Sequence, residues 1–306
     1  MQAKTDISEL FFPVLTRMVF TQIEDYENPV QIPGKMALIN GISKLPISIV
    51  SHDYRIILNK EAYNYGLNCL KTLFDLEQND EIVFINSIRP KTLSFCHMDL
   101  TCPKKSFELR KDKFIPFVRV TNSYNSTFKL GFRVGVCRAI CENGVIFGED
   151  SIRFSFVHSK SNKEEINFEI KKDELKRILD KFKSDIEVLI DNEIDKNYAF
   201  SLFCKGIGIN FREGEKGKKR RNNVQAEFNP VFDKYCTELG DNFYALYNSI
   251  TELSTNGMEA DKMPVTRIHG RQSRAGVWQR EVASLLKKKQ FDYREYLKDY
   301  LEISVN

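Results

Sequence analysis

Lysine and arginine side chains are gathered in three stretches of this chain, at residues 110–119, 216–221 and 267–289. Dense cations bind the phosphates of nucleic acids, because each contact releases counterions from the polyanion. The sequence therefore predicts that these stretches contact a nucleic-acid backbone. The predicted strand that follows the first stretch is expected to do the same. The predicted contact residues are Arg119, Arg133, Arg138, Lys216, Lys218, Lys219, Arg220, Arg221, Arg267, Arg271 and Arg274.

The overall charge does not decide this question. The chain has 46 basic and 42 acidic residues, a formal net charge of +4. Binding depends on the local density of cations on one face rather than on the sum. Because many carboxylates are available to neutralise the basic stretches, an ordinary solvated surface is the alternative interpretation.

Aromatic side chains near the first basic stretch could stack on unpaired bases if they faced solvent. The candidates are Tyr124, Phe128 and Phe132. The alternation of apolar residues places Phe128 and Phe132 with Leu130 and Val134 on the core face of a strand. Stacking by these two phenylalanines is therefore the less favoured interpretation.

The chain has no recognisable catalytic motif. It lacks a Gly-x-Ser-x-Gly turn, a phosphate-binding Gly-x-x-x-x-Gly-Lys-Ser/Thr loop and a dinucleotide-binding Gly-x-Gly-x-x-Gly turn. No nucleophile can be paired with a base by spacing, so an enzyme that uses Cys141 or a histidine is the last-ranked hypothesis. No catalytic residue and no cofactor is predicted.

Seven cysteines are scattered through the chain. Zinc sites need four thiolate or imidazole ligands, and Cys96, His97, Cys102, Cys137 and Cys141 lack the short spacing that marks such sites. Buried reduced thiols are the simpler interpretation. We predict no metal and no structural disulfide.

The pattern of apolar residues predicts the elements that carry these groups. Residues 42–58 and 81–117 read as short strands, and Asn59 is expected to cap a helix with Tyr63, Leu67, Leu70 and Phe74 on one side. From 117 to 157 the chain alternates, with Leu130, Phe132, Val134 and Val136 on one face and Lys129, Gly131 and Arg133 on the other. After residue 162 the period becomes helical, with Leu175, Ile178, Leu179, Phe182, Ile186 and Leu189 on one side of a long helix.

These elements predict an α+β fold, a central and mainly antiparallel sheet backed by amphipathic helices with a helical C-terminal third. We expect a mixed α/β region at 1–160 and a mainly helical region at 161–306, packed as one compact unit. The glycine-rich, basic segment 205–223 is expected to be a mobile loop. No apolar run is long enough to cross a bilayer and the N-terminus does not read as a secretion signal, so no membrane association and a cytoplasmic location are expected.

The stretch RVTNSYNSTFKLGFRVGVCRAICENG resembles the core of a family of phage- and plasmid-borne proteins of unknown function. The shared features are an Asn-Ser-Tyr-Asn turn, a Gly-Phe-Arg strand and an Arg-x-x-Cys-x-Asn-Gly segment. Two further stretches, VSHDYRIILNKEAY at 50–63 and LYNSITEL at 246–253, also resemble elements of the family. The signature residues outside the strand are Asn122, Ser123, Tyr124, Asn125, Asn143 and Gly144.

The resemblance implies a mobile-element protein encoded near replication, recombination or anti-defence genes, with a suspected relation to single-strand annealing proteins. Asn125 departs from the family pattern, where Asp is common, so a role that needs a carboxylate there is in doubt. Asn and Gly also suit tight turns, so the signature is either a folding device or a ligand contact.

The first hypothesis is a non-enzymatic accessory protein that binds nucleic acid, with single-stranded DNA the suggested ligand, through the basic sheet face and loop. The alternative is a modulator or inhibitor that binds a host defence or replication protein and uses its basic surface to dock an acidic partner. The sequence does not fix the oligomeric state.

Overall fold

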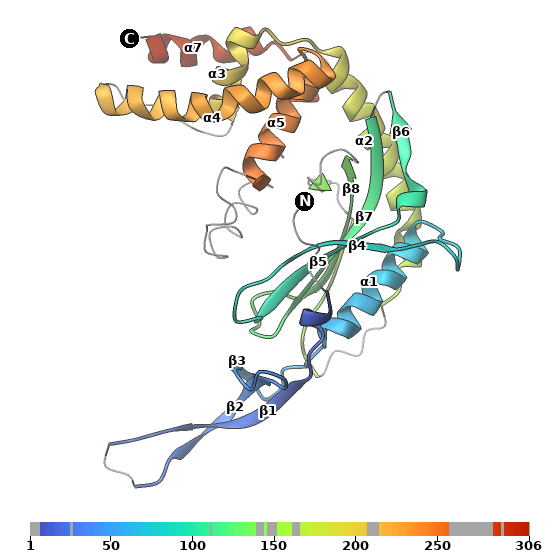
Figure 1. The fold of residues 1–306 in the computed structure, drawn as a ribbon, viewed down its shortest axis with the longest axis vertical. Helices are drawn as coiled ribbons and strands as arrows, with labels where there is room; N and C mark the ends of the chain where they lie inside the picture. The colour runs from blue at the N-terminus through green and yellow to red at the C-terminus, as the bar shows by residue number, and fades with distance from the viewer. Residues whose placement is uncertain are drawn as a thin grey trace. The chain divides into compact units, whose positions relative to one another are not determined.

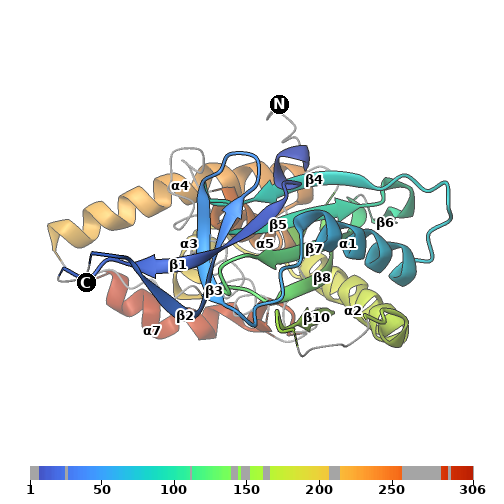
Figure 2. The same cartoon turned by 90° about the horizontal axis from the view of Figure 1, so that it is seen from below.

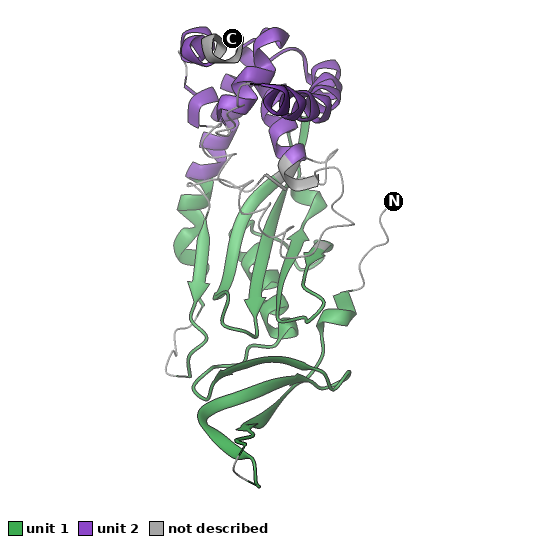
Figure 3. Cartoon of the chain, turned by 90° about the vertical axis from the view of Figure 1, so that its left-hand side faces the viewer, with its two compact units in different colours: residues 1–147, 151–176 green, residues 148–150, 177–306 purple. Residues whose placement is uncertain are grey.

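The structure is a computed structural model that describes residues 7–24, 27–110, 112–138, 144–145, 152–160, 166–206, 214–256, 284–288 and 291–305. The chain forms two compact units (Figure 3). Unit 1 comprises residues 1–147 and 151–176, and unit 2 comprises residues 148–150 and 177–306. The expectation that the two sequence regions pack as one unit stays a prediction.

Unit 1 contains two antiparallel sheets (Figure 1). One is three-stranded in the order β1-β2-β3, and the other follows the path β10-β8-β7-β5-β4, with β6 paired to β7 and β9 to β8. The strands are β1 (Val14–Thr21), β2 (Val30–Asn40), β3 (Pro46–Ser51), β4 (Val83–Ile88), β5 (Phe95–Thr101), β6 (Phe107–Leu109), β7 (Asp112–Ser123), β8 (Leu130–Arg138), β9 (Gly144–Val145) and β10 (Arg153–Phe156).

The helices and short 3-10 turns complete both units, and together with the antiparallel sheets they confirm the predicted α+β class. The 3-10 turns are η1 (Ile7–Leu10), η2 (Pro103–Lys105) and η3 (Glu169–Lys171). The helices are α1 (Asn59–Leu73), α2 (Lys172–Asp191), α3 (Lys196–Gly206), α4 (Glu215–Leu239), α5 (Phe243–Asn256) and α7 (Tyr293–Val305). No helix in these described ranges is both long and apolar enough to cross a membrane.

The alternation predicted for β8 is confirmed. Leu130, Phe132 and Val134 are at most 1% exposed, and Arg133 between them is exposed. The prediction for Phe128 is wrong, because β8 begins only at Leu130. The ring of Phe128 belongs to the preceding turn and is not governed by the alternation of the strand.

Helix α1 covers the apolar face of the larger sheet, against β5, β7 and β8 (Figure 2). A Cβ atom at Gly66 would lie 2.3 Å from Cγ2 of Val120, so the helix approaches the strand as closely as a glycine allows. Consequently the buried side of the helix carries Ala62, Gly66 and Cys69 rather than the predicted Tyr63 and Leu67. The prediction for Leu70 is confirmed, because Leu70 is fully buried, and Leu73 is buried as well.

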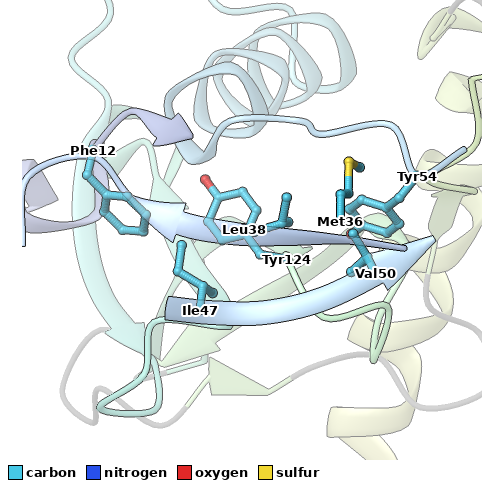
Figure 4. Packing of buried hydrophobic residues seen from close by; sticks show 7 residues of the cluster. All are labelled: Phe12, Met36, Leu38, Ile47, Val50, Tyr54 and Tyr124. Carbon is cyan, nitrogen blue, oxygen red and sulfur yellow. The ribbon is translucent and has the colours of Figure 1, made fainter. Parts of the chain in front are cut away.

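A second apolar cluster joins the three-stranded sheet to the turn between β7 and β8 (Figure 4). The ring of Tyr124 lies among side chains from β2 and β3, and it is fully buried. Its ring centroid is 5.8 Å from that of Phe12. The members of the cluster are Phe12, Met36, Leu38, Ile47, Val50, Tyr54 and Tyr124.

In α2 the predicted helical stripe is confirmed, since Leu175, Phe182, Ile186 and Leu189 are buried. Helices α3 and α4 share an aromatic contact, in which the ring of Phe228 stacks on Phe203 with centroids 4.7 Å apart. Five cysteines whose side chains the structure describes are buried free thiols: Cys69, Cys96, Cys102, Cys204 and Cys236.

His158 makes the stability of unit 1 sensitive to pH. Its Nδ1 donates to the carbonyl of Arg55 at 3.1 Å, its ring stacks on Tyr54, and its Nε2 is buried without a hydrogen-bond partner in the described part of the chain. Burial lowers the pKa of His158 below its usual value, and the hydrogen bond to Arg55 only partly offsets this.

Because the folded state then binds fewer protons than the unfolded state, the contribution of neutral His158 to stability is fully present above about pH 6.5. This contribution is lost as the pH falls through the folded pKa. We expect the free energy of unfolding, measured by urea titration, to decrease between about pH 7.5 and pH 5. His158 contributes at most about 1.4 kcal/mol per pH unit to this decrease. His158→Gln should reduce that dependence. An unchanged pH dependence in the variant would assign it to other groups.

Candidate nucleic-acid interface

The prediction of a mobile loop is wrong for residues 214–223. Gly214 precedes a helix that continues without interruption from Glu215 to Leu239. Lys, Arg, Gln and Glu are strong helix formers, so the charges that suggested a loop instead support helix. Phe228, Phe232 and Tyr235 bury the second half of α4 and hold it in place. Residues 207–213 of the predicted loop lie outside the described ones.

The first half of α4 carries five cations in six residues, which we call the α4 basic segment. Four of them are exposed, and none of these four makes an ion pair with the part of the chain that the structure describes. Arg221 is half-buried and lies near Cys204 and Tyr300. The segment consists of Lys216, Lys218, Lys219, Arg220 and Arg221.

Helix geometry places the exposed cations around the side of α4 that points away from the core of unit 2. Gly217 and Phe228 mark the buried side, and no residue between them is buried. At 3.6 residues per turn, Lys219 lies on the opposite side and Lys216 lies on its flank. Such a surface attracts phosphate groups with little cost in desolvation, because its ammonium and guanidinium groups are already in water.

A second basic site lies across four strands of the larger sheet in unit 1. Asp99 of β5 is opposite Arg119 of β7, Arg119 is opposite Arg133 of β8, and Arg133 is opposite Arg153 of β10. Residues directly opposite one another share a face, so these four form one transverse row. We call it the arginine row. It lies on the face opposite to the one that α1 covers.

Asp99 fixes one end of the arginine row. Its carboxylate accepts hydrogen bonds from Nε and Nη2 of Arg119, both at 2.7 Å. The two side chains are 12% and 19% exposed, so this is a largely buried bidentate pair. The pair offsets the repulsion expected between arginines on neighbouring strands. Arg119 is therefore already engaged, and Arg133 and Arg153 are the exposed members of the row.

The remaining predicted contact residues are not brought into this row. Position 138 is the last residue of β8, and its backbone is opposite Phe114 of β7. Its side chain is outside the described ones, as are Arg267, Arg271 and Arg274 and the signature residue Asn143. The sequence pattern did not indicate that Asp99 and Arg153 belong to this site, because only the strand register connects them to Arg119.

The first three residues of the signature turn, Asn122, Ser123 and Tyr124, are buried, and the fourth, Asn125, is half-buried. Nδ2 of Asn122 donates at 2.8 Å to the carbonyl of Ile57 and at 2.8 Å to Oδ1 of Asn59. The hydroxyl of Tyr124 accepts the backbone N–H of Asn59 at 2.9 Å, which satisfies one of the unpaired donors at the start of α1. Asn122 and Tyr124 are fully buried.

These contacts connect two of the stretches on which the resemblance to a family rests. Tyr54 and Asn59 come from residues 50–63, and their partners Ser123 and Asn122 come from the signature turn. Asn59 does not cap α1 with its side chain as expected. Instead its amide donates to the carbonyl of Leu10 at 3.1 Å. We call Tyr54, Asn59, Asn122, Ser123 and Tyr124 the signature node, and its role is architectural.

The aromatic residues considered for base stacking are mostly unavailable. Phe132 and Tyr124 are at most 1% exposed. Phe128 is half-buried, and its ring contacts Phe95 and His97 at centroid distances of 5.2 and 5.3 Å. Ser123 positions Phe128, because its hydroxyl donates to the carbonyl of Phe128 and accepts the N–H of the same residue.

Among the residues that the structure describes, no group of three or more histidine, cysteine, aspartate or glutamate side chains is placed to hold a metal ion. The two surfaces found are cationic: an exposed helix in unit 2 and a row of arginines in unit 1. Both are suited to anion binding.

The fold and these surfaces define an α+β protein with a basic helix exposed to solvent. A family model described as Domain of unknown function (DUF932) matches residues 46–285. Because the match covers most of the chain, the protein belongs to this family. No curated protein and no solved structure matches it.

Proposed function

We propose that this protein is a non-enzymatic accessory protein that binds nucleic acid, of the kind that phages and plasmids encode, and that its expected location is the cytoplasm. The observation that supports this best is the α4 basic segment, with Lys216, Lys218, Lys219 and Arg220 exposed and not paired to described carboxylates. A protein that only needed a soluble helix surface would gain from interleaved acidic residues, as in α2.

The arginine row is a secondary candidate surface. Arg133 and Arg153 are its exposed members, so these two would be the ones to reach a ligand. The burial of Tyr124 and Phe132 removes two of the three aromatic residues that a single-stranded ligand would stack on. The proposal therefore depends on phosphate contacts and not on stacking. Phosphate contacts alone do not specify a role in recombination or annealing.

The test is the salt dependence of binding by the purified, nuclease-treated protein. A labelled oligonucleotide should bind at about 50 mM salt, and log K should fall linearly with log salt. Four phosphate contacts give a slope of about −3 to −4. Fluorescence anisotropy across a salt series measures both quantities. Absence of binding to single- and double-stranded oligonucleotides at low salt would refute the proposal, and a protein retained from nuclease-treated lysate would then favour the host-protein modulator.

A further inference from the structure

The exposed side of the first half of α4 is rich in lysine, arginine and asparagine, which is more than solubility of the helix requires. At 3.6 residues per turn, Lys219, Asn223 and Ala226 lie near its centre, opposite the mean direction of all the buried residues of α4, which are Gly217, Phe228, Phe232, Tyr235 and Cys236. Lysine, arginine and asparagine side chains flank this line. The flanking residues are Lys216, Arg220, Lys218 and Asn222.

Asn222 and Asn223 are adjacent in the interior of an exposed helix, where asparagine is a poor helix former. Both side chains are exposed, and neither amide has a hydrogen bond with the part of the chain that the structure describes. The fold gains nothing visible from them. Each amide presents an NH2 donor group and a carbonyl acceptor to a ligand that approaches this side of the helix.

The dimensions of this half of α4 match a DNA groove. Ten residues, 218–227, separate the buried Gly217 from the buried Phe228, and none of them is buried. At 1.5 Å per residue they extend for about 15 Å, and a helix with side chains is about 10–12 Å wide. The major groove of B-form DNA is about 12 Å wide and admits one helix. Cations on both flanks of the exposed side would then face the two phosphate backbones.

We propose that the first half of α4 enters the major groove of duplex DNA, with Asn223 contacting a base edge and the flanking cations contacting phosphates. This inference rests on the proposed function and specifies its ligand as a duplex. The amide of asparagine forms a bidentate pair with N6 and N7 of adenine, and the methyl group of Ala226, one turn further along the same line, suits contact with a thymine methyl group. The preferred site therefore contains an adenine at the position that Asn223 faces.

The experiment selects bound sequences from a randomised duplex library and from a randomised single-stranded library, using the full-length protein at about 100 mM salt. The wild type is expected to bind the duplex library more tightly and to enrich adenine at one position. Asn223→Ala should reduce that enrichment roughly tenfold, because a bidentate pair discriminates a base by about this factor or more. It should change affinity for the unselected duplex library less than threefold.

Asn222→Ala is the matched control, since it removes the neighbouring amide from a flank of the same exposed side. It should leave the adenine enrichment unchanged. Alanine favours helix more than asparagine, so loss of folding does not explain an effect of either variant. Preference for the single-stranded library, enrichment that survives Asn223→Ala, or the absence of any enrichment would overturn the inference while leaving nucleic-acid binding intact. Failure to bind either library would instead refute the proposed function.

Discussion

Replacing Lys216, Lys218, Lys219 and Arg220 together with glutamine is expected to weaken DNA binding by at least a hundredfold at about 0.1 M salt. Each phosphate contact contributes about 0.9 to the slope of log K against log salt on duplex DNA, so four contacts account for about 3.6. The variant should therefore bind with a much shallower salt dependence. Glutamine is nearly as good a helix former as lysine, so α4 should persist. Anisotropy at several salt concentrations measures both changes, and circular dichroism checks the helix.

Helix α2 supplies a control with the same change in charge. Four exposed cations on α2 are accompanied by acidic residues such as Asp173, Glu174 and Asp180. Neutralising them with glutamine should change affinity less than fivefold, because only the nonspecific field of the protein is altered. Equal losses in the two quadruple variants would show that net charge, and not the α4 surface, governs binding. The control positions are Lys176, Arg177, Lys181 and Lys183.

Replacing Asn122 with alanine is expected to destabilise unit 1 by about 2–4 kcal/mol. The amide makes two hydrogen bonds at full burial, to the carbonyl of Ile57 and the side chain of Asn59. Their removal takes one donor from the carbonyl of Ile57 and leaves Oδ1 of Asn59 with only the weak thiol donor of Cys96 at 3.3 Å. An unsatisfied buried group costs about 1–3 kcal/mol. Urea unfolding followed by near-ultraviolet circular dichroism measures the loss.

Asn125 provides the comparison, because it belongs to the same signature turn. Its side chain accepts only the N–H of Thr127, at 3.1 Å near the surface. Asn125→Ala should cost less than about 1 kcal/mol. At a temperature where both variants are folded, DNA affinity should stay within twofold of the wild type. A strong loss of binding in a folded Asn122 variant would contradict the architectural role of the signature node.

The sequence predicted the class of fold because its local periods are clear. Strict alternation in β8 and a helical period from Leu175 to Leu189 each correspond to the buried residues that the structure contains. Local rules failed where a tertiary contact decided the outcome. Helix α1 turns Gly66 and Ala62 to the sheet because close approach to Val120 favours small residues over large ones.

The candidate site was less predictable, for two physical reasons. Cations and glycines near residue 216 suggested a loop, yet Phe228 and Phe232 lie a few turns further along the same helix and anchor it. The four- and three-residue spacing of Phe228, Phe232 and Tyr235 was the signal that could have predicted a helix here. The partners of Arg119 depend on strand register, which joins residues 99, 119, 133 and 153 from four strands and cannot be read from any one of them.

Lysine acetylation of the full-length protein, with and without a saturating DNA duplex, tests the central claim most directly. Mass spectrometry reports the rate of modification at each lysine. We predict that DNA protects Lys216, Lys218 and Lys219 at least fivefold and leaves Lys181 and Lys183 of α2 unchanged, because phosphates would cover only the exposed side of α4. Unprotected α4 lysines in a protein that binds the duplex would contradict the account.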